Sequence, residues 1–373
     1  LSIRRQRQMC IRDRYISVQS GDWNNPSTWN LNSVPNNQAE VIIQAEHVVS
    51  IADNSHCKYL RLEGTLAIDT DSLFLDSIYI SQTGLLHQQG GFTRLGNAGG
   101  GKSRWLINGA IEVTDGFIEI NGGLSFIGQS STLIQEGGTI VFDPYASVNP
   151  SPITPLHFTS GAVGLIEIST STNCVFSGGV LQFRDPMPDS THEFIRAGYN
   201  TPPTFGGSHT TIFGSPQAVD GLDIKMNLES GEFPGDRIEF NNLTLQSTLQ
   251  NSSANRNIFK VNNLYVNGQL SVFNPGAILD CGYLQLAGDL FSDTLTLCDI
   301  NTLNFSRYND APVLTPQRVY GAGDLKKQEM INSDTSLVAS LWINNQSIQG
   351  VSYEKGNLSV GGLRSVSYTH LTL

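Results

Sequence analysis

Charged residues are scarce in this sequence, because Asp, Glu, Lys and Arg together make up 15% of its 373 residues. Soluble domains usually carry about 25%. Basic residues are the scarcer kind, since 22 Lys and Arg stand against 33 Asp and Glu, for a net charge of -11. Binding to nucleic acid needs clustered Lys and Arg that neutralise phosphate groups. The composition therefore argues against a nucleic-acid partner.

Cysteine and long apolar runs are also rare. No run of about 18 apolar residues occurs, so we predict no transmembrane segment. The five Cys form no Cys-x-x-Cys pair, and they are too few for the disulfide framework of a small secreted domain. We predict that Cys57, Cys174, Cys281 and Cys298 are buried small apolar residues. Whether they form disulfides is left open by the sequence.

What the sequence has in abundance is a short phrase, Leu-x-Leu-x-Gly-x-Leu or its Val variant. It occurs at Leu60–Leu66, Leu264–Leu270 and Leu284–Leu290, and Leu303 stands at the next expected place. The starts at positions 264, 284 and 303 are almost evenly spaced. A period of about 20 residues is typical of strand and turn units that bury their apolar face only by stacking on their neighbours. The sequence predicts an all-β fold, a right-handed parallel β-helix.

We expect one continuous solenoid, with an N-terminal cap and first strands over residues 15–50 and the β-helix over residues 51–364. Proline-rich stretches interrupt the apolar alternation, and we predict that they project as loops. They lie near residues 143–160, 184–222 and 309–334.

A second phrase indicates how the corners are made. Gly137–Pro144 begins with Gly-Gly and ends with Asp-Pro, and the phrase returns at Gly178–Pro186. Gly-Gly before a strand supplies the positive φ of a tight corner, and Asp-Pro ends the strand. The offset from position 137 to position 178 is twice the period of the Leu phrase, so it predicts two turns between the copies.

Both ends of the chain differ from the rest. Residues 1–14 (LSIRRQRQMCIRDR) and residues 365–373 (SVSYTHLTL) resemble translated sequencing-adaptor read-through of the kind found at the edges of metagenomic genes. The alternative for the first stretch is a basic tail for nucleic acid or targeting, since it holds five Arg. We expect neither end to belong to the fold. Without residues 1–14 the chain has 17 Lys and Arg against 32 Asp and Glu, or -15, and we expect the native termini, any signal peptide and any anchor to lie outside this sequence.

The stretch Gly21–Ile51 has the order G-x-W, W, V-P and V-x-I. This order resembles the opening of bacterial secreted β-helix proteins and is loosely similar to the eight-glycine domain. The resemblance implies a secreted or cell-surface location. From the residues themselves we expect Trp23 and Trp29 to cover the exposed end of the solenoid. The alternative is a platform on which sugar rings stack.

The best acid-base constellation lies within one predicted loop and consists of Arg184, Asp185, Asp189, His192, Glu193 and Arg196. Four of them could act as acid, base or nucleophile: Asp185, Asp189, His192 and Glu193. Polysaccharide lyases and glycosidases on β-helices place carboxylates and basic residues beside the sugar. A solvated charged loop has the same composition, and we favour that interpretation. The four residues remain the candidates for catalysis.

Gly96–Ser103 matches the phosphate-loop pattern G-x-x-x-x-G-K-[ST]. That site also needs a helix directly after Ser103, whereas the alternation in Trp105–Val113 predicts a strand. We therefore predict no bound nucleotide. The His residues show no metal-ligand spacing, so we predict no metal and no cofactor.

Three functions remain. The leading hypothesis, which the resemblance implies, is a non-enzymatic extracellular β-helix shaft, an adhesin-like or passenger-like segment of a larger bacterial surface or secreted protein. The alternatives are a carbohydrate-active enzyme, either a polysaccharide lyase or a glycosidase, and a glycan-binding module without chemistry. Extracellular glycans or cell-surface components are the expected partners.

Overall fold

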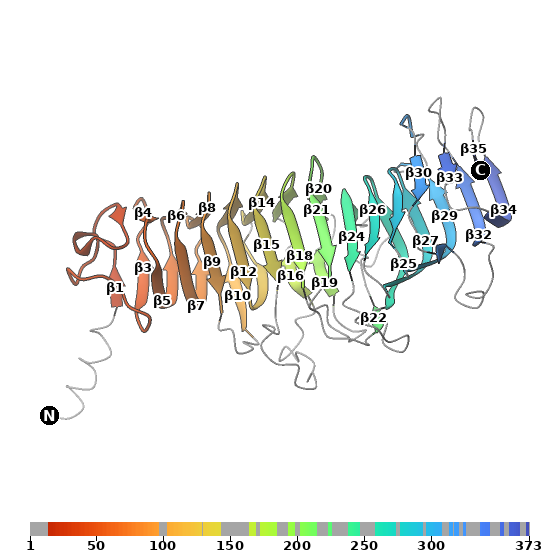
Figure 1. Cartoon of the computed structure of the whole chain (residues 1–373). Coiled ribbons are helices and arrows are strands. Elements are labelled where there is room, and N and C mark those ends of the chain that lie inside the picture. The colour runs from red at the N-terminus through yellow and green to blue at the C-terminus, as the bar shows by residue number, and fades with distance from the viewer. Residues whose placement is uncertain are drawn as a thin grey trace. The chain divides into compact units, whose positions relative to one another are not determined.

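The computed structural model is nearly all β, with one short 3-10 helix among the residues that it describes (Figure 1). These are residues 14–96, 103–128, 130–142, 164–168, 172–184, 193–197, 202–214, 223–225, 238–246, 258–273, 277–293, 296–307, 313–315, 317–320, 324–325, 336–343, 351–353, 358–365 and 371–372. The chain forms two compact units: unit 1 lies within residues 1–148, 158–180 and 195–203, and unit 2 within residues 149–157, 181–194 and 204–373.

Unit 1 is a coil with three strands in each turn. One turn consists of β8 (Leu85–Gln88), β9 (Phe92–Leu95) and β10 (Ser103–Ile107). The next consists of β11 (Ala110–Val113), β12 (Phe117–Ile120) and β13 (Gly122–Phe126). Each strand pairs in parallel with the corresponding strand of the next turn, β8 with β11, β9 with β12 and β10 with β13. Unit 1 is therefore a parallel β-helix with three sheets, as the sequence predicts.

The second and third sheets of unit 1 share the two long strands β5 and β7, whereas the first sheet is separate. The first sheet holds β2 (Gly21–Asp22), β4 (Val48–Ile51), β6 (Thr65–Ile68), β8, β11, β14 (Thr132–Gln135) and β17 (Asn173–Phe176). The second holds the N-terminal halves of β5 (Ser55–Leu62) and β7 (Ser72–Ile80), then β9, β12 and β15 (Thr139–Phe142). The third holds β1 (Arg14–Ile16), β3 (Glu40–Ile43), the C-terminal halves of β5 and β7, then β10, β13 and β16 (Gly164–Ile168).

The interior of unit 1 is built from side chains in register. Alternate residues of each strand point inward, and one interior column consists of Leu66, Leu86, Ile111, Leu133 and Cys174, all of them buried. Each large aliphatic side chain in such a column contributes about 1.5–3 kcal/mol through burial. Cys174 takes the place of an aliphatic residue, and Cys57, Cys281 and Cys298 are also buried free thiols. The prediction of buried small apolar cysteines is confirmed.

Glycines with positive φ form one corner of unit 1. Gly91, Gly116, Gly138 and Gly179 have φ values of 61°, 81°, 61° and 71°. The first three directly precede strands of the second sheet, and Gly179 directly precedes β18 (Val180–Phe183). A Cβ atom on Gly138 would lie 2.7 Å from the carbonyl oxygen of Gly116, so the turns approach too closely for any side chain. The predicted role of Gly-Gly as a corner is confirmed for the second glycine of each pair.

The predicted spacing of the two Gly-Gly phrases is wrong. Thr132 of β14 is the direct partner of Asn173 of β17, and the carbonyl oxygen of Gly138 accepts a hydrogen bond from Val180 N–H at 2.9 Å. The copies therefore lie one turn apart. The additional residues, 143–163, follow β15 and are outside the described part of the chain.

Unit 2 contains two further sets of parallel strands. One consists of β22 (Asp223–Lys225), β25 (Ile258–Val266), β27 (Ile278–Leu286), β29 (Leu297–Phe305), β32 (Ser336–Ile343) and β34 (Leu358–Ser365), with β23 (Glu239–Phe240) on β25 and β31 (Asp324–Leu325) on β29. The other consists of β21 (Thr210–Phe213), β24 (Asn242–Gln246), β26 (Leu270–Phe273), β28 (Leu290–Ser292), β30 (Gln317–Tyr320), β33 (Val351–Tyr353) and β35 (Leu371–Thr372). The remaining strands are β18 (Val180–Phe183), β19 (Glu193–Ala197) and β20 (Thr204–Phe205).

The register of unit 2 confirms the repeat found in the sequence. Leu264 pairs with Leu284, and Leu284 pairs with Leu303, so the predicted rungs stand directly on one another. Part of each of two predicted excursions is nevertheless strand: β19, β20 and β21 lie within residues 184–222, and β30 and β31 lie within residues 309–334.

Both terminal segments that we expected outside the fold carry some strand structure. Arg14 pairs with Glu40, and its guanidinium lies 2.9 Å from the Glu40 carboxylate. At the other end, Leu371 pairs with Val351, and Ser365 is the last residue of β34. The adaptor origin of these ends stays a prediction.

Candidate functional site

The predicted catalytic cluster falls almost wholly outside the described residues. Asp185, Asp189 and His192 lie there, and for Glu193 only the backbone is described, as the first residue of β19. Catalysis by these four residues stays a hypothesis. Among the described residues, no group of three or more His, Cys, Asp and Glu side chains is placed to hold a metal ion.

The phosphate-loop match lacks the element that the chemistry needs. Ser103 is the first residue of β10, a strand that pairs with β13. Residues 97–102 are outside the described part of the chain. A phosphate loop requires the N-terminus of a helix at this place. The structure has the strand β10 there instead, so the predicted strand is confirmed.

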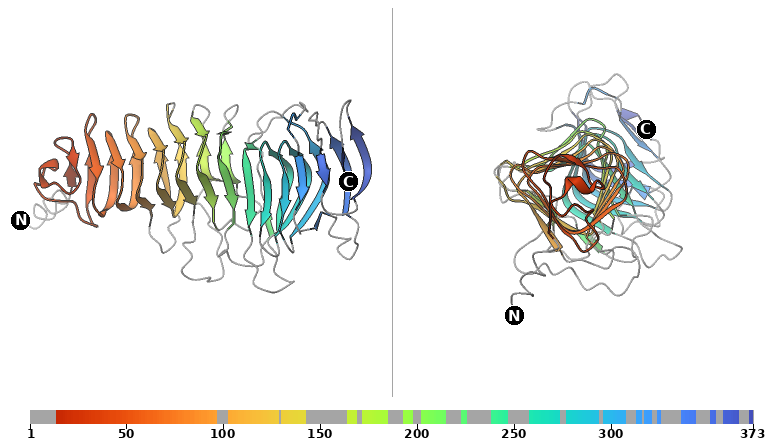
Figure 2. Two further views of the ribbon diagram at one scale, coloured as in Figure 1. Left: turned by 45° about the horizontal axis from the view of Figure 1, so that its top comes forward. Right: turned by 90° about the vertical axis from the view of Figure 1, so that its left-hand side faces the viewer.

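The two tryptophans of the N-terminal segment are interior residues. Trp23 and Trp29 are 0% and 2% exposed, and their rings meet edge to face with centroids 5.1 Å apart. The indole N–H of Trp29 donates to the carbonyl oxygen of Trp23 at 2.7 Å. The 3-10 helix η1 (Pro26–Thr28) between them lies over the end of the coil of unit 1 (Figure 2, right). Buried rings cannot stack on a sugar, so this arrangement fits the cap and excludes a Trp platform.

A row of outward aromatic side chains crosses the second sheet of unit 1. We call it the unit 1 stripe, and it consists of His56, Phe74, Phe92 and Phe117. The rings of His56 and Phe74 stack at 4.9 Å, those of Phe74 and Phe92 lie 5.7 Å apart, and those of Phe92 and Phe117 stack at 5.5 Å. All four rings are at least partly exposed, while the residues that alternate with them, such as Leu73 and Leu75, are buried.

One cation and one carboxylate accompany the stripe. The guanidinium carbon of Arg94 lies 5.7 Å from the ring centroid of Phe74 and 5.4 Å from that of Phe92. Arg94 Nε also donates to a Glu119 carboxylate oxygen at 2.9 Å. The register explains this contact, because Arg94 and Glu119 are direct partners in β9 and β12. The guanidinium is thus fixed above the rings, and its charge is matched.

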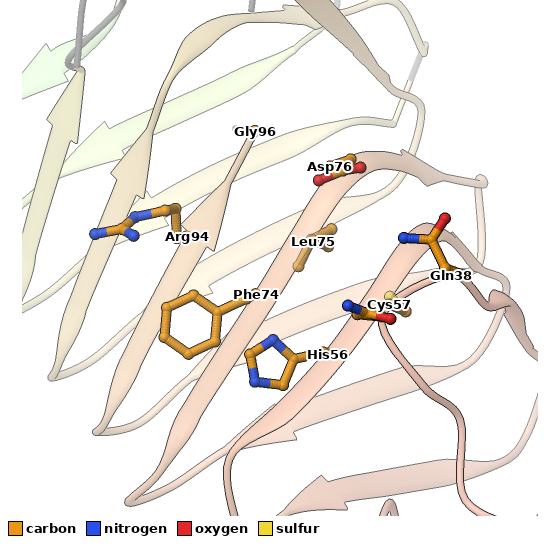
Figure 3. Close-up of a pocket in the computed structure, with 9 residues that line it drawn as sticks. Gln38, His56, Cys57, Phe74, Leu75, Asp76, Arg94 and Gly96 are labelled. Carbon is orange, nitrogen blue, oxygen red and sulfur yellow. The ribbon is translucent and has the colours of Figure 1, made fainter. Parts of the chain in front are cut away.

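A hollow of about 420 Å³ adjoins the stripe where β5 and β7 turn from the second sheet into the third. It is lined by Asn37, Gln38, His56, Cys57, Phe74, Leu75, Asp76, Arg94 and Gly96. Figure 3 shows the Phe74 ring between the side chains of His56 and Arg94, with Asp76 and Gln38 on the other side of the hollow. The hollow therefore combines ring faces with amide and carboxylate groups that can form hydrogen bonds.

Two ionisable groups of the described lining, Asp76 and Cys57, bear on the chemistry of the hollow. Asp76 is the one carboxylate among the lining residues, whereas glycoside hydrolysis in most families needs two carboxyl groups flanking the bond. Burial raises the pKa of the Cys57 thiol, and the nearby Asp76 carboxylate raises it further. Both effects favour the neutral thiol over the reactive thiolate.

The stripe is not among the sites predicted from the sequence, although its residues leave a signal there. Phe74, Phe92 and Phe117 occupy the positions between inward residues, where most outward neighbours are polar. Single exposed apolar residues are normal, whereas a contiguous apolar patch marks an interaction surface. The signal becomes specific only when the turns are aligned, because the sequence separation between aligned residues differs from one turn to the next.

Comparisons with known proteins identify no relative, since no family model, no curated protein and no solved structure matches the chain. No described helix has the length and apolar character needed to cross a membrane.

Proposed function

We propose that this chain is a non-enzymatic, adhesin-like β-helix segment of a secreted or cell-surface protein, and that the unit 1 stripe binds an extracellular polysaccharide. The observation that carries the proposal is the run of four part-exposed rings on successive turns, with centroids 4.9–5.7 Å apart. Parallel strands repeat about every 4.7–4.9 Å, which sets the spacing of the direct partners His56 and Phe74 and of Phe92 and Phe117. Phe74 and Phe92 lie diagonally across neighbouring strands, since the direct partner of Phe74 is Arg94.

Carbohydrate suits this surface because a sugar ring has an apolar face of C–H groups and an edge of hydroxyl groups. The C–H groups lie favourably against the negative face of an aromatic ring. The hydroxyl groups find partners in Asn37, Gln38 and Asp76 beside Phe74. Binding sites for small polar molecules commonly combine aromatic walls with a few placed polar groups.

The side chains of the stripe are held in place before any ligand arrives. Arg94 is fixed by Glu119, and each ring contacts the ring of a neighbouring turn. Contacts between aromatic rings contribute about 0.5–1.5 kcal/mol each. A surface ordered in this way loses little side-chain entropy on binding.

The test is affinity electrophoresis in gels that contain soluble polysaccharides, with the wild type beside the Phe74→Ala/Phe92→Ala variant. We expect at least one polysaccharide to retard the wild type. The double variant should bind that polysaccharide at least about tenfold more weakly, because it loses two ring contacts. Leu106→Ala is the matched control, since Leu106 is 44% exposed on β10 in the third sheet. Absence of retardation across the panel, or equal retardation of wild type and double variant, would refute a binding role for the stripe.

A further inference from the structure

Unit 2 carries its own row of outward aromatic residues. The ring centroids of Phe273 and Phe291 lie 5.2 Å apart, and those of Phe291 and Tyr320 lie 5.1 Å apart. The three residues belong to β26, β28 and β30, which pair in that order, and Phe291 is the direct partner of Tyr320. All three rings are part-exposed, while Leu270, Leu290 and Val319 of the same strands are buried. We call Phe273, Phe291 and Tyr320 the unit 2 stripe.

An arginine and a carboxylate flank this row as well. The guanidinium carbon of Arg318 lies 4.6 Å from the centroid of the Tyr320 ring. Its Nε and Nη2 atoms donate to the same Asp289 carboxylate oxygen at 3.1 and 2.9 Å. The main-chain N–H of Arg318 donates to the other oxygen of Asp289 at 2.8 Å. Three hydrogen bonds therefore fix the pair and match its charge.

An amide also faces the unit 2 stripe. Gln269 Nε2 donates to Ser271 Oγ at 2.9 Å and to the Tyr320 hydroxyl at 3.4 Å. Both stripes thus combine aromatic rings, an amide and an arginine paired with a carboxylate, and the unit 2 stripe adds the hydroxyl group of Tyr320. Ser271, the outward partner of Phe291, is buried, whereas the rings of Phe273, Phe291 and Tyr320 stay part-exposed.

We propose that the unit 2 stripe is a second, separate binding site and that its ligand is an uncharged polysaccharide. The proposal takes the polysaccharide class of ligand from the proposed function, but its residues do not depend on the unit 1 stripe. Charge indicates an uncharged ligand. The positive charge of Arg318 is matched by Asp289, so a polyanion meets no unmatched cation among the described side chains that contact the stripe. The chain's net charge of -11 also disfavours the approach of a polyanion.

The experiment uses the full chain and two probes, hydroxyethyl cellulose as the uncharged polymer and polygalacturonate as the anionic one. Phe291→Leu is introduced into the wild type and into the Phe74→Ala/Phe92→Ala variant, because Leu keeps apolar volume and removes the ring face. Phe291→Tyr keeps a ring face and serves as the conservative variant. Leu314→Ala, at a residue that is 64% exposed, is the matched control in unit 2.

We expect the Phe74→Ala/Phe92→Ala variant to keep part of its retardation by hydroxyethyl cellulose and to lose it when Phe291→Leu is added. In the wild type, Phe291→Leu should weaken the binding assigned to unit 2 about fivefold, the scale of one ring contact. Phe291→Tyr and Leu314→Ala should behave as their parent. Unchanged thermal midpoints show that the variants fold, and Phe273→Leu replaces Phe291→Leu if the latter does not.

The other outcomes separate this inference from the proposed function. If the unit 1 variant loses all binding and Phe291→Leu changes nothing, unit 1 holds the site and the unit 2 proposal is overturned. If Phe291→Leu removes binding while the unit 1 variant keeps all of it, the unit 2 proposal stands and the unit 1 stripe is not the site. Stronger retardation by polygalacturonate than by hydroxyethyl cellulose overturns the uncharged ligand, and no retardation by either polymer overturns the second site.

Discussion

The carbonyl oxygen of Gly138 accepts a hydrogen bond from the main-chain N–H of Val180 at 2.9 Å, which places the two residues on neighbouring turns of the coil. Gly138 itself adopts a φ of 61°, and Gly179 beside Val180 repeats that conformation at 71°. The corner of one turn therefore rests on the corner of the next, backbone against backbone.

This contact predicts a large cost for any side chain at the corner. Gly138→Ala should lower the free energy of unfolding by about 2 kcal/mol or more, because the left-handed backbone costs an L-residue about 1–2 kcal/mol and the added Cβ would lie 2.7 Å from Gly116 O. Urea denaturation monitored by circular dichroism measures the change.

Gly206→Ala is the control for that measurement, since no heavy atom lies within 4 Å of a Cβ built at Gly206. We expect it to change the free energy of unfolding by no more than about 0.5 kcal/mol, as surface substitutions usually do. Equal stabilities of Gly138→Ala and the wild type would contradict the corner geometry.

His209 predicts a dependence of stability on pH. Burial lowers the pKa of this side chain from 6.5 to about 4. At a pH between these two pKa values, His209 is protonated in the unfolded chain and neutral in the folded chain. The free energy of unfolding should therefore be fully maintained above about pH 6.5 and should fall by up to about 3 kcal/mol as the pH drops to about 4.

The measurement compares urea denaturation of the wild type and His209→Leu at several pH values. Carboxylates that titrate in the same range affect both proteins, so the difference between them isolates His209. We expect that difference to change between about pH 6.5 and 4 and to stay constant above this range. A constant difference over the whole range would show that the pKa of His209 is not lowered.

The four catalytic candidates from the sequence predict a further outcome. If the loop is only a solvated surface, replacing Asp185, Asp189, His192 and Glu193 with Asn or Gln should change the free energy of unfolding by about 0.5 kcal/mol or less at each site. We also expect the wild type to release no reducing ends from a broad panel of acidic and neutral polysaccharides.

Reducing-end assays of the wild type and single variants test this expectation. Turnover that falls by about 10²-fold or more in the Asp189→Asn or Glu193→Gln variant would identify a lost acid or base. The chain would then be a carbohydrate-active enzyme, and the adhesin-like proposal would fail.

The sequence by itself determined the parallel β-helix and much of its register. Leu264, Leu284 and Leu303 align in the structure as their spacing predicts, because inward positions alternate along a strand and each turn must place apolar residues over those of the turn before. Positive φ at Gly138 and Gly179 was likewise predictable, since glycine adopts that conformation without a Cβ clash.

Only the tertiary structure decided which outward residues meet. A corner can take up many additional residues at little entropic cost, because the cost of closing a loop grows slowly with its length. The stretch from one Gly-Gly phrase to the next therefore makes one turn, where spacing alone predicted two. Because the number of residues in a turn varies, the sequence alone does not reveal either aromatic stripe. Phe92 and Phe117 are recognised as neighbours only from the backbone pairing, and so are Phe291 and Tyr320.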